Sequence, residues 1–279
     1  MHPLAPRSCL FVPADQPQRL ARAWSLDADV VIVDLEDAVA PQNKALARTT
    51  LSDHIAAAGP PASALWIRIN ALDTEDAAVD LELVAQWPAT AGLVVPKARA
   101  ASLTEIRAGK PIVALVETAA GLLEAPDVAV SPGVSQLMLG TLDLAADLDV
   151  EVSPVADVFR YARVQLALAS AAAGLPGPID GVWAGISDPD GMRAEAQIAL
   201  AAGFTGKACI HPKQIAVAHE VFTPSPDAVA RARRIVMAAD SAARTGDAVI
   251  ALDGRMVDRP VVERARRLVA SADAAAAHS

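Results

Sequence analysis

Short apolar runs rich in β-branched residues recur along the chain and alternate with longer segments of helical periodicity. Helical spacing of alanine and leucine is clearest in Lys44–Ala58, Ala77–Gln86, Asp157–Ala173 and Pro189–Ala202. Because strand and helix alternate, and because the strands are apolar on both faces, the pattern predicts a parallel sheet covered on both sides. Eight runs are predicted to be strands: Ser8–Pro13, Asp29–Leu35, Leu65–Asn70, Gly92–Lys97, Pro111–Glu117, Gln136–Asp143, Ile179–Gly185 and Gly206–Pro212.

The number of predicted strands favours a closed barrel over an open sheet. Eight strands, most of them followed by a helix, are typical of a (β/α)8 TIM barrel, and a chain of 279 residues is long enough for one such domain. No strand is followed by the Gly-x-Gly-x-x-Gly turn of dinucleotide-binding sheets. We therefore expect an α/β barrel over residues 1–221.

The pattern changes after Phe222. A Pro-Ser-Pro segment is followed by a predicted helix over Asp227–Arg244, a glycine-containing turn, and a last helix from about Pro260 to Ala274. This segment predicts a C-terminal helical arm over residues 222–279. Since the arm begins after the eighth strand, we expect it to wrap the barrel or to reach a neighbouring subunit.

Composition narrows the class of protein further. Hydrophobic residues make up 53% of the chain and aromatic residues only 3%, so the core must consist of Ala, Val, Leu and Ile. The net charge of −9 makes nucleic acid and anionic membrane surfaces poor partners. The absence of a signal peptide or a long apolar run leads us to expect a cytoplasmic protein. Cys9 and Cys209 stand far apart in apolar runs, which predicts reduced core residues rather than a disulfide or a zinc site.

Charged residues gather at the ends of the predicted strands, where barrel enzymes place their chemistry. A helix cap or a surface ion pair could account for any single one of them. Because several converge on one rim of the barrel, we interpret them together as a functional site. The group comprises Asp34, Glu36 and Asp37 after the second strand, Arg68 and Asn70, Lys97, Glu117, Asp143 and His211.

Two of these carboxylates suggest a metal site. Glu117 and Asp143 close consecutive predicted strands, so both should project into the same mouth of the barrel. Oxygen ligands without a nearby His or Cys cluster favour Mg²⁺, and a 2-oxo acid could complete its coordination. Arg68 would face a negatively charged group, while Glu36 and Asp37 would hold metal-bound water or orient the arginine. The alternative is a closed network of arginine and carboxylates without a metal.

Several segments along the chain carry a family resemblance, which runs from about residue 7 to residue 270. The chain resembles the citrate lyase β-subunit-like, or HpcH/HpaI aldolase, family, and is especially similar to its stand-alone CoA-ester lyases, such as citramalyl-CoA and malyl-CoA lyases. The segments are Arg7-Ser-Cys-Leu-Phe-Val-Pro13, Val30-Val-Ile-Val-Asp-Leu-Glu-Asp-Ala-Val39, Ile67-Arg-Ile-Asn70, Val95-Pro-Lys97, Val116-Glu-Thr-Ala-Ala-Gly121, Ile210-His-Pro-Lys-Gln-Ile215 and Asp253-Gly-Arg-Met-Val-Asp-Arg-Pro260.

The resemblance implies roles for particular residues. It implies that Glu117 and Asp143 ligate Mg²⁺, that Arg68 contacts the substrate, and that Glu36 and Asp37 take part in catalysis. It also implies that Asp258 enters the mouth of an adjacent subunit as an acid/base group. The protein is accordingly expected to be a homo-oligomer, commonly a trimer in this family.

The implied reaction is a reversible cleavage of a 3-hydroxyacyl-CoA ester into acetyl-CoA and a 2-oxo acid, so coenzyme A is part of the substrate. Arg19 and Lys44 are candidates to meet its phosphates. Two alternatives remain open. One is a non-catalytic or carrier-dependent β subunit of a citrate-lyase-like complex, and the other is a Schiff-base aldolase using Lys97 or Lys207.

The chain departs from the family pattern at two positions. Ala14 follows Pro13 where glycine is usual, and Leu142 precedes Asp143 where glutamate is usual. These departures leave the acyl group and the 2-oxo acid undetermined. We interpret His211 as a structural residue of the loop after the last strand, since a following proline restricts its backbone.

Overall fold

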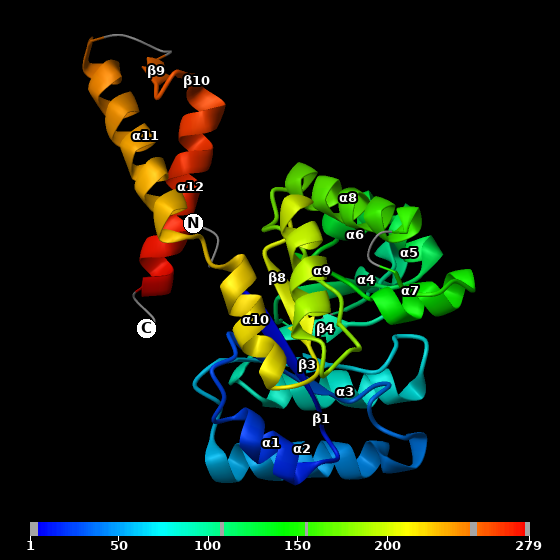
Figure 1. Cartoon of the computed structure of the whole chain (residues 1–279). Helices are drawn as coiled ribbons and strands as arrows, with labels where there is room; N and C mark the ends of the chain where they lie inside the picture. The colour runs from blue at the N-terminus through cyan, green and yellow to red at the C-terminus, as the bar shows by residue number, and fades with distance from the viewer. Residues whose placement is uncertain (1–4, 107–108, 154–155, 246–249, 277–279) are drawn as a thin grey trace. The chain divides into compact units, whose positions relative to one another are not determined.

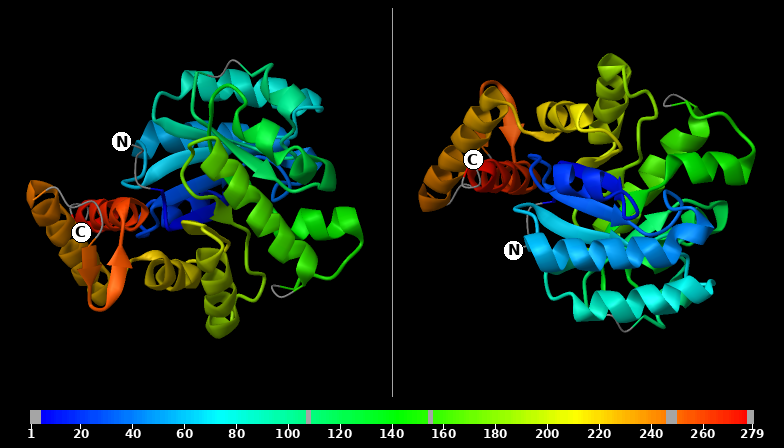
Figure 2. Two further views of the ribbon diagram at one scale, coloured as in Figure 1. Left: turned by 90° about the horizontal axis from the view of Figure 1, so that it is seen from above. Right: turned by 90° about the horizontal axis from the view of Figure 1, so that it is seen from below.

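The computed structural model describes residues 5–106, 109–153, 156–245 and 250–276. The chain divides into two compact units, Met1–Phe222 and Thr223–Ser279. The first unit is a closed barrel of eight parallel strands in chain order, with helices around the outside (Figures 1 and 2). The predicted TIM barrel is confirmed. Within the described part of the chain, no helix is long and apolar enough to cross a membrane.

All eight predicted strands are present, but most end earlier than the apolar pattern indicates. The sixth predicted strand was extended to Asp143, whereas β6 ends at Leu139 and a helix begins at Thr141. Leu142 and Leu144 are two residues apart, a spacing that places both on one face of a strand, as the sequence pattern predicted. In the helix, Leu144 is buried and Leu142 is exposed. The strands are β1 (Ser8–Pro13), β2 (Val30–Asp34), β3 (Ala64–Arg68), β4 (Thr90–Val95), β5 (Ile112–Val116), β6 (Val134–Leu139), β7 (Ile179–Asp180) and β8 (Gly206–Cys209).

Helices connect the strands, and the four that were predicted agree with the observed ones within two residues. The helices of the first unit are α1 (Pro17–Ala23), the 3-10 turn η1 (Pro41–Asn43), α2 (Lys44–Ala58), α3 (Glu75–Gln86), α4 (Ala100–Leu103), α5 (Ala119–Leu123), α6 (Ala125–Ala129), α7 (Thr141–Leu148), α8 (Asp157–Ala172), α9 (Pro189–Ala201) and α10 (Lys213–Phe222). Asp188 caps α9 by accepting a hydrogen bond from the Gly191 amide, and Pro189 occupies its first turn.

The barrel has two separate hydrophobic cores. One consists of strand residues alone, among them Ile32, Trp66, Val113 and Met138, and fills the barrel interior. The other combines strand and helix residues and fills the layer between the barrel and its helices. Inside the barrel, the Trp66 ring takes the space beside Gly92, where an added Cβ would lie 2.7 Å from the ring. Both cysteines are buried and free, as expected.

The second unit consists of two helices and a β-hairpin between them. Its elements are α11 (Pro226–Thr245), β9 (Ile250–Leu252), β10 (Arg255–Val257) and α12 (Arg259–Ala276). The glycine-containing turn predicted from sequence is the hairpin turn, in which Asp253 and Gly254 have φ angles of 53° and 72°. Ion pairs from Arg233 to Asp273 and from Arg266 to Asp240 join the two helices. That this unit reaches a neighbouring subunit stays a prediction.

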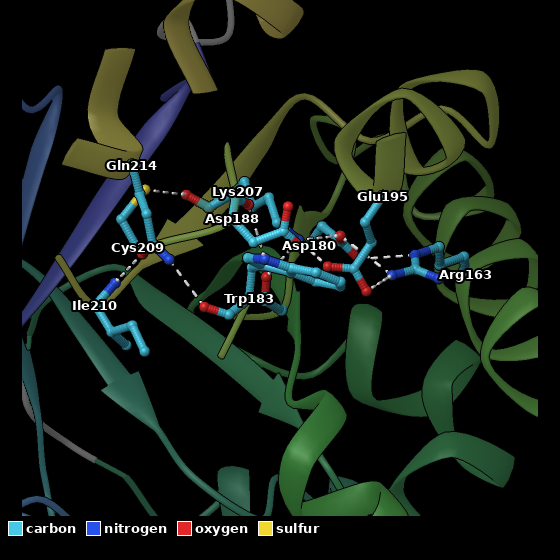
Figure 3. Close-up of polar contacts among 10 residues, drawn as sticks. Arg163, Asp180, Trp183, Asp188, Glu195, Lys207, Cys209, Ile210 and Gln214 are labelled. Atoms are coloured by element: carbon cyan, nitrogen blue, oxygen red, sulfur yellow. Dashed lines mark hydrogen bonds and ion pairs between the residues drawn. The ribbon is translucent and has the colours of Figure 1, made fainter. Parts of the chain in front are cut away.

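A charge-balanced network is buried in the first unit, where β7 and β8 meet α8 and α9 (Figure 3). Lys207 Nζ lies 2.7 Å from both Asp180 Oδ2 and Glu195 Oε2, and it donates to the Gly181 carbonyl at 2.8 Å. Arg163 pairs with the same two carboxylates, at 2.8 Å to Asp180 and 2.9 Å to Glu195. Each of these four side chains is at most 1% exposed. Two cations and two carboxylates therefore neutralise one another inside the fold, although Arg163 Nη1 has no hydrogen-bond partner.

Removal of one partner from this network should be costly, because it leaves a buried charge uncompensated. We expect Lys207→Met to lower the free energy of unfolding by about 3–5 kcal/mol, measured by urea denaturation. Arg193→Met, which breaks the exposed Arg193–Glu220 pair, is the control and should cost no more than about 1 kcal/mol. Equal losses in the two variants would contradict a structural role for the network.

Candidate active site

A cavity of about 800 Å³ opens at the carboxyl ends of the strands. It is lined by most of the charged residues that the sequence analysis assigned to this rim: Asp34, Asp37, Arg68, Glu117, Asp143 and His211. Apolar side chains from β1, β5, β6 and α1 and from the loops after β7 and β8 line much of the remainder. The rim of the barrel thus forms one pocket that combines fixed charges with apolar surface, as small-molecule sites do.

Arg68, the last residue of β3, is held by two carboxylates. Its Nε and Nη2 donate to Asp34 Oδ1 and Oδ2 at 2.8 and 2.5 Å, and Nη1 lies 3.0 Å from Glu36 Oε2. The guanidinium also lies over the Phe11 ring, 5.1 Å from its centroid. Although burial alone would lower it, the pKa of Arg68 is raised by its carboxylate neighbours. The guanidinium is therefore a fixed positive charge with a defined plane.

Asp34 organises the loop after β2, a role that the sequence analysis did not assign to it. Besides Arg68, its carboxylate accepts hydrogen bonds from the backbone amides of Glu36 at 2.8 Å and Ala38 at 3.3 Å. Lys44 holds the same loop from the other side, because its Nζ donates to the carbonyls of Leu35 and Glu36, both at 2.7 Å. The sequence signal was available: an aspartate at the end of a strand whose five residues are all buried must have a buried partner.

Glu36 links Arg68 to Lys97. Its carboxylate is buried, and Lys97 Nζ lies 3.0 Å from its Oε1. Burial raises the pKa of Glu36 despite the two cations. The same ion pair raises the pKa of Lys97, whose side chain is half-exposed. A lysine that is held protonated by a carboxylate is a poor imine-forming nucleophile, so the geometry disfavours the Schiff-base alternative at Lys97. Lys207, fully paired in the buried network, is disfavoured for the same reason.

Glu117 directly follows β5 and is only 1% exposed. Its Oε1 accepts a hydrogen bond from the Lys97 amide at 2.9 Å, and Lys97 has the left-handed φ of 48° in the turn that presents this amide. Desolvation, followed by repulsion from Asp143 and Glu36, raises the pKa of Glu117 to about 8. Gly140 makes room for the carboxyl group, because an added Cβ there would lie 2.6 Å from Oε2 and 2.4 Å from the Glu117 Cβ.

Asp143 stands in the first turn of α7 and not on the sixth strand, as the apolar pattern had suggested. It nevertheless lines the same cavity as Glu117 and is close enough to raise its pKa. The predicted neighbourhood of the two carboxylates is therefore correct, although the helix and not the strand presents Asp143. An aspartate in the first turn also benefits from the amino-terminal helix dipole.

The donor set at this position fits a magnesium ion. Glu117 and Asp143 supply oxygen ligands only, and their mutual repulsion is the kind that a divalent cation relieves. In residues 5–106, 109–153, 156–245 and 250–276, no cluster of three or more His, Cys, Asp or Glu is placed to hold a metal. Two protein carboxylates would thus leave several coordination positions of the metal to water and substrate, which is how Mg²⁺ is usually bound.

The remaining predicted residues lie in different parts of the structure. Arg19 is exposed on α1 and lines the cavity together with Arg22, which the sequence analysis missed and which stands one helical turn away. Asp37 is exposed and lines the cavity next to Asp34. Asp258 directly precedes α12 in the second unit, where its Oδ1 accepts a hydrogen bond from the Val261 amide at 3.3 Å. Its part in a shared site stays a prediction.

Gln214 was also missed, and it joins two loops that line the cavity (Figure 3). Its Oε1 accepts from the amides of Ile210 at 2.8 Å and His211 at 3.2 Å, and its Nε2 donates to the Trp183 carbonyl at 2.8 Å. His211 Nδ1 in turn accepts from the Lys213 amide at 3.2 Å, so its ring is oriented by the start of α10. The side chain of one buried glutamine therefore fixes the loops after β7 and β8 to each other.

A closed (β/α)8 barrel whose charged pocket lies at the carboxyl ends of its strands has the arrangement typical of barrel enzymes. The model of the HpcH/HpaI aldolase/citrate lyase family matches residues 7–212. The chain belongs to this family.

Similar proteins differ in the reaction that their names state. The chain is 37% identical to a (3S)-malyl-CoA thioesterase of Cereibacter sphaeroides over 92% of this chain and 90% of the relative. It is 32% identical to an L-malyl-CoA/beta-methylmalyl-CoA lyase of the same species, over 92% and 91%. Its fold is similar to that of CitE from Mycobacterium tuberculosis in complex with magnesium, acetoacetate and coenzyme A, with a TM-score of 0.81, 37% identity and coverage of 98% and 100%.

The raised pKa of Glu117 predicts a pH-dependent stability of the metal-free protein. The folded state holds the Glu117 proton more tightly than the unfolded chain, whose carboxyl titrates near 4.5. This contribution is full below pH 4.5 and is lost as pH rises through about 8. In EDTA, urea unfolding should show wild-type stability falling across this window, by up to a few kcal/mol, relative to Glu117→Gln.

Glu105→Gln, at an exposed surface carboxyl, serves as the control and should follow the wild-type profile. A constant difference between wild type and Glu117→Gln at every pH would contradict the raised pKa.

Proposed function

We propose that this protein is a magnesium-dependent lyase that reversibly cleaves a 3-hydroxyacyl-CoA ester into acetyl-CoA and a 2-oxo acid. The observation that carries the proposal is the pair of mutually repelling carboxylates, Glu117 and Asp143, beside the fixed guanidinium of Arg68 in one cavity. The magnesium, acetoacetate and coenzyme A bound to the similar structure, and the malyl-CoA activities named for the relatives, support it.

Glu117 and Asp143 would hold the metal. When bound, Mg²⁺ supplies a Lewis acid that polarises the substrate oxygen destined to become the carbonyl of the 2-oxo acid. Both carboxylates must be ionised for this, which the cation itself favours. Lys97 contributes through its backbone, because its amide fixes Oε1 of Glu117 and leaves the carboxyl group oriented toward the cavity.

Arg68 stabilises the negative charge that develops on the thioester enolate. Its plane is fixed by the bidentate contact with Asp34, which uses N–H groups of Nε and Nη2, while Nη1 lies 3.0 Å from Glu36 Oε2 without a hydrogen bond. We assign its remaining N–H donors to a substrate oxygen in the cavity. A preorganised donor of this kind needs no reorientation when charge develops, which is the main source of electrostatic catalysis.

Proton transfer requires two further groups. Glu36 is locked between Arg68 and Lys97 and positions the arginine, whereas the exposed Asp37 faces the cavity and is our candidate to accept the hydroxyl proton. We assign protonation of the enolate carbon to Asp258 of a neighbouring subunit in a homotrimer. The support for this assignment is its Met-Val-Asp motif, which resembles the trans-acting motif of the family.

Coenzyme A would be bound through its phosphates at α1. Arg19 and Arg22 lie one turn apart on this helix, and both line the cavity. Lys44, the other predicted contact, already uses two of its three N–H donors on the carbonyls of Leu35 and Glu36. We therefore place the phosphates on the two arginines and leave Lys44 the role of supporting the Glu36 loop.

Hydrolysis of the thioester is a second candidate, favoured by the malyl-CoA thioesterase at 37% identity. The two reactions are distinguished by their products. Purified protein with Mg²⁺ is incubated with malyl-, methylmalyl-, citramalyl- and citryl-CoA, and 2-oxo acid, acetyl- or propionyl-CoA and free thiol are measured. A 2-oxo acid released together with an intact acyl-CoA supports the lyase, whereas a free thiol with an intact hydroxy acid supports the thioesterase. No product from the purified protein alone would favour a carrier-dependent subunit.

The metal ligands are tested by isosteric substitution. Glu117→Gln and Asp143→Asn should each abolish Mg²⁺-dependent turnover while the fold is retained, because an amide is a weaker magnesium ligand of similar shape. Turnover is measured as a function of Mg²⁺ concentration, and circular dichroism checks the fold. Asp149→Asn, at the end of the same helix α7, is the matched control and should stay active. Normal turnover in either ligand variant would remove the metal site.

Arg68 is tested by Arg68→Lys. A lysine keeps the positive charge but cannot reproduce the bidentate contact with Asp34 or the remaining N–H donors. We expect kcat/KM to fall by on the order of 10²–10³, with Arg193→Lys on the surface as the control. An unchanged kcat/KM would reduce Arg68 to an ion-pair partner at the rim.

The shared site is tested by mixing two inactive proteins, Asp258→Ala and Glu117→Gln. If Asp258 acts in a neighbouring subunit, mixed oligomers contain some sites with a wild-type Asp258 and a wild-type Glu117, so part of the activity returns after subunit exchange. Mass spectrometry verifies that the oligomers are mixed. Verified mixed oligomers that stay inactive, or a fully active monomer, would return Asp258 to its role as the cap of α12.

A further inference from the structure

One wall of the cavity is apolar and solvent-exposed. Leu142, Ile186 and Ile210 are 43%, 46% and 39% exposed, and all three line this cavity. They follow β6, β7 and β8, three neighbouring strands, so they occupy one continuous arc of the rim. A single exposed aliphatic side chain is ordinary, but three that converge on one wall of a pocket indicate a surface that a ligand covers.

The arginine side chains of the cavity come from other strands and the helices that follow them, beginning with β1, which pairs with β8. Arg68, at the end of β3, is already paired with Asp34 and Glu36, and the other two cavity-lining arginines, Arg19 and Arg22, stand on α1. From the loops after β6, β7 and β8, no Lys or Arg among the described residues lines the cavity. His211 lines the cavity beside Ile210, at the β8 end of the wall. A carboxylate placed against Leu142 and Ile186, at the β6 and β7 end, would lie near Asp143 with no Lys or Arg from these loops beside it.

We propose that this wall binds an alkyl substituent of the 2-oxo acid and that Leu142 is the residue that selects it. The protein would then act on CoA esters whose cleavage releases a monocarboxylic 2-oxo acid with an alkyl chain, and would discriminate against a dicarboxylic one. This inference rests on the proposed function, because it assumes that the acid is held at Glu117 and Asp143.

The position of Leu142 identifies which part of the substrate meets the wall. Leu142 directly precedes Asp143 in the first turn of α7, so the wall begins beside a residue that would hold the acid. The phosphates of coenzyme A are assigned to Arg19 and Arg22 on α1, which follows β1. The substituent of the acid is thus the part of the substrate that starts nearest to Leu142. A glutamate at this position would place a second negative charge there, whereas leucine offers only apolar contact.

The test is the binding of free 2-oxo acids, measured by titration calorimetry in the presence of Mg²⁺ and independently of turnover. Glyoxylate, pyruvate, 2-oxobutyrate and oxaloacetate differ only in the substituent. We expect 2-oxobutyrate to bind more tightly than glyoxylate and oxaloacetate by roughly tenfold or more, the discrimination that an apolar pocket achieves for small alkyl groups. CoA esters that release the same acids should follow the same order in kcat/KM.

Three variants test whether Leu142 sets the order of affinities for the 2-oxo acids. Leu142→Lys should invert this order in favour of oxaloacetate, because an ammonium then faces the second carboxylate. Leu142→Met should preserve the order, since methionine keeps the apolar volume. Leu200→Lys is the matched control: Leu200 is 45% exposed on α9 and does not line the cavity, so the order should not change.

The outcomes separate this inference from the proposed function. If oxaloacetate binds the wild-type protein as well as 2-oxobutyrate does, or if Leu142→Lys leaves the order of affinities unchanged, the inference is wrong. Neither result contradicts the proposed lyase activity. If free acids bind without any order but Leu142→Lys weakens the CoA esters, the wall holds the pantetheine arm, and the inference is wrong as well. If no 2-oxo acid binds and no CoA ester is cleaved, the proposed function itself fails.

Discussion

The buried ion pair between Arg68 and Asp34 is the interaction on which the mouth of the barrel depends. It joins the ends of β2 and β3, which also pair in register at these two residues. Asp34 uses its other lone pairs to hold the backbone of the loop that carries Glu36, and Glu36 in turn reaches both Arg68 and Lys97. Lys97 then supplies the amide that fixes Glu117. The orientation of one guanidinium is thereby transmitted across four strands to the candidate metal ligand.

The barrel contains two charge networks that differ in net charge. The neutral network is structural, whereas the network with excess negative charge lies at the candidate active site. Around Lys207, two cations meet two carboxylates, and all four side chains are buried and paired. At the mouth, Arg68 and Lys97 face Asp34, Glu36, Glu117 and Asp143, so two carboxylates lack a cation of the chain. A buried and unmatched carboxylate is unfavourable unless something else neutralises it. In the metal-free protein the raised pKa of Glu117 lets a proton relieve this excess negative charge, and a divalent cation can take the place of that proton.

The apolar pattern of the sequence predicted the barrel correctly but did not predict where its strands end. Strand order and number follow from alternation of apolar runs and helical segments, and Glu117 and Asp143 could be paired because barrel topology brings consecutive strand ends together. The pattern failed at Asp143, since Leu142 and Leu144 continue an apolar run whose residues are already helical. It gave no role to Asp34 or Gln214, because their partners are backbone groups or residues distant in sequence. It gave none to Arg22, because only the folded structure shows that this residue lines the cavity.

Division of the cavity into a charged arc and an apolar arc has a consequence for specificity within the family. The charged arc is coupled through Arg68, Glu36 and Lys97, so a change at any one of them disturbs the others. The apolar side chains have no such coupling: Leu142 stands in the first turn of α7, and Ile186 and Ile210 stand on the loops after β7 and β8, which Gln214 joins through backbone groups and not through these side chains. Substitutions there alter the shape and charge of the pocket while the ion pairs that hold the reacting groups persist.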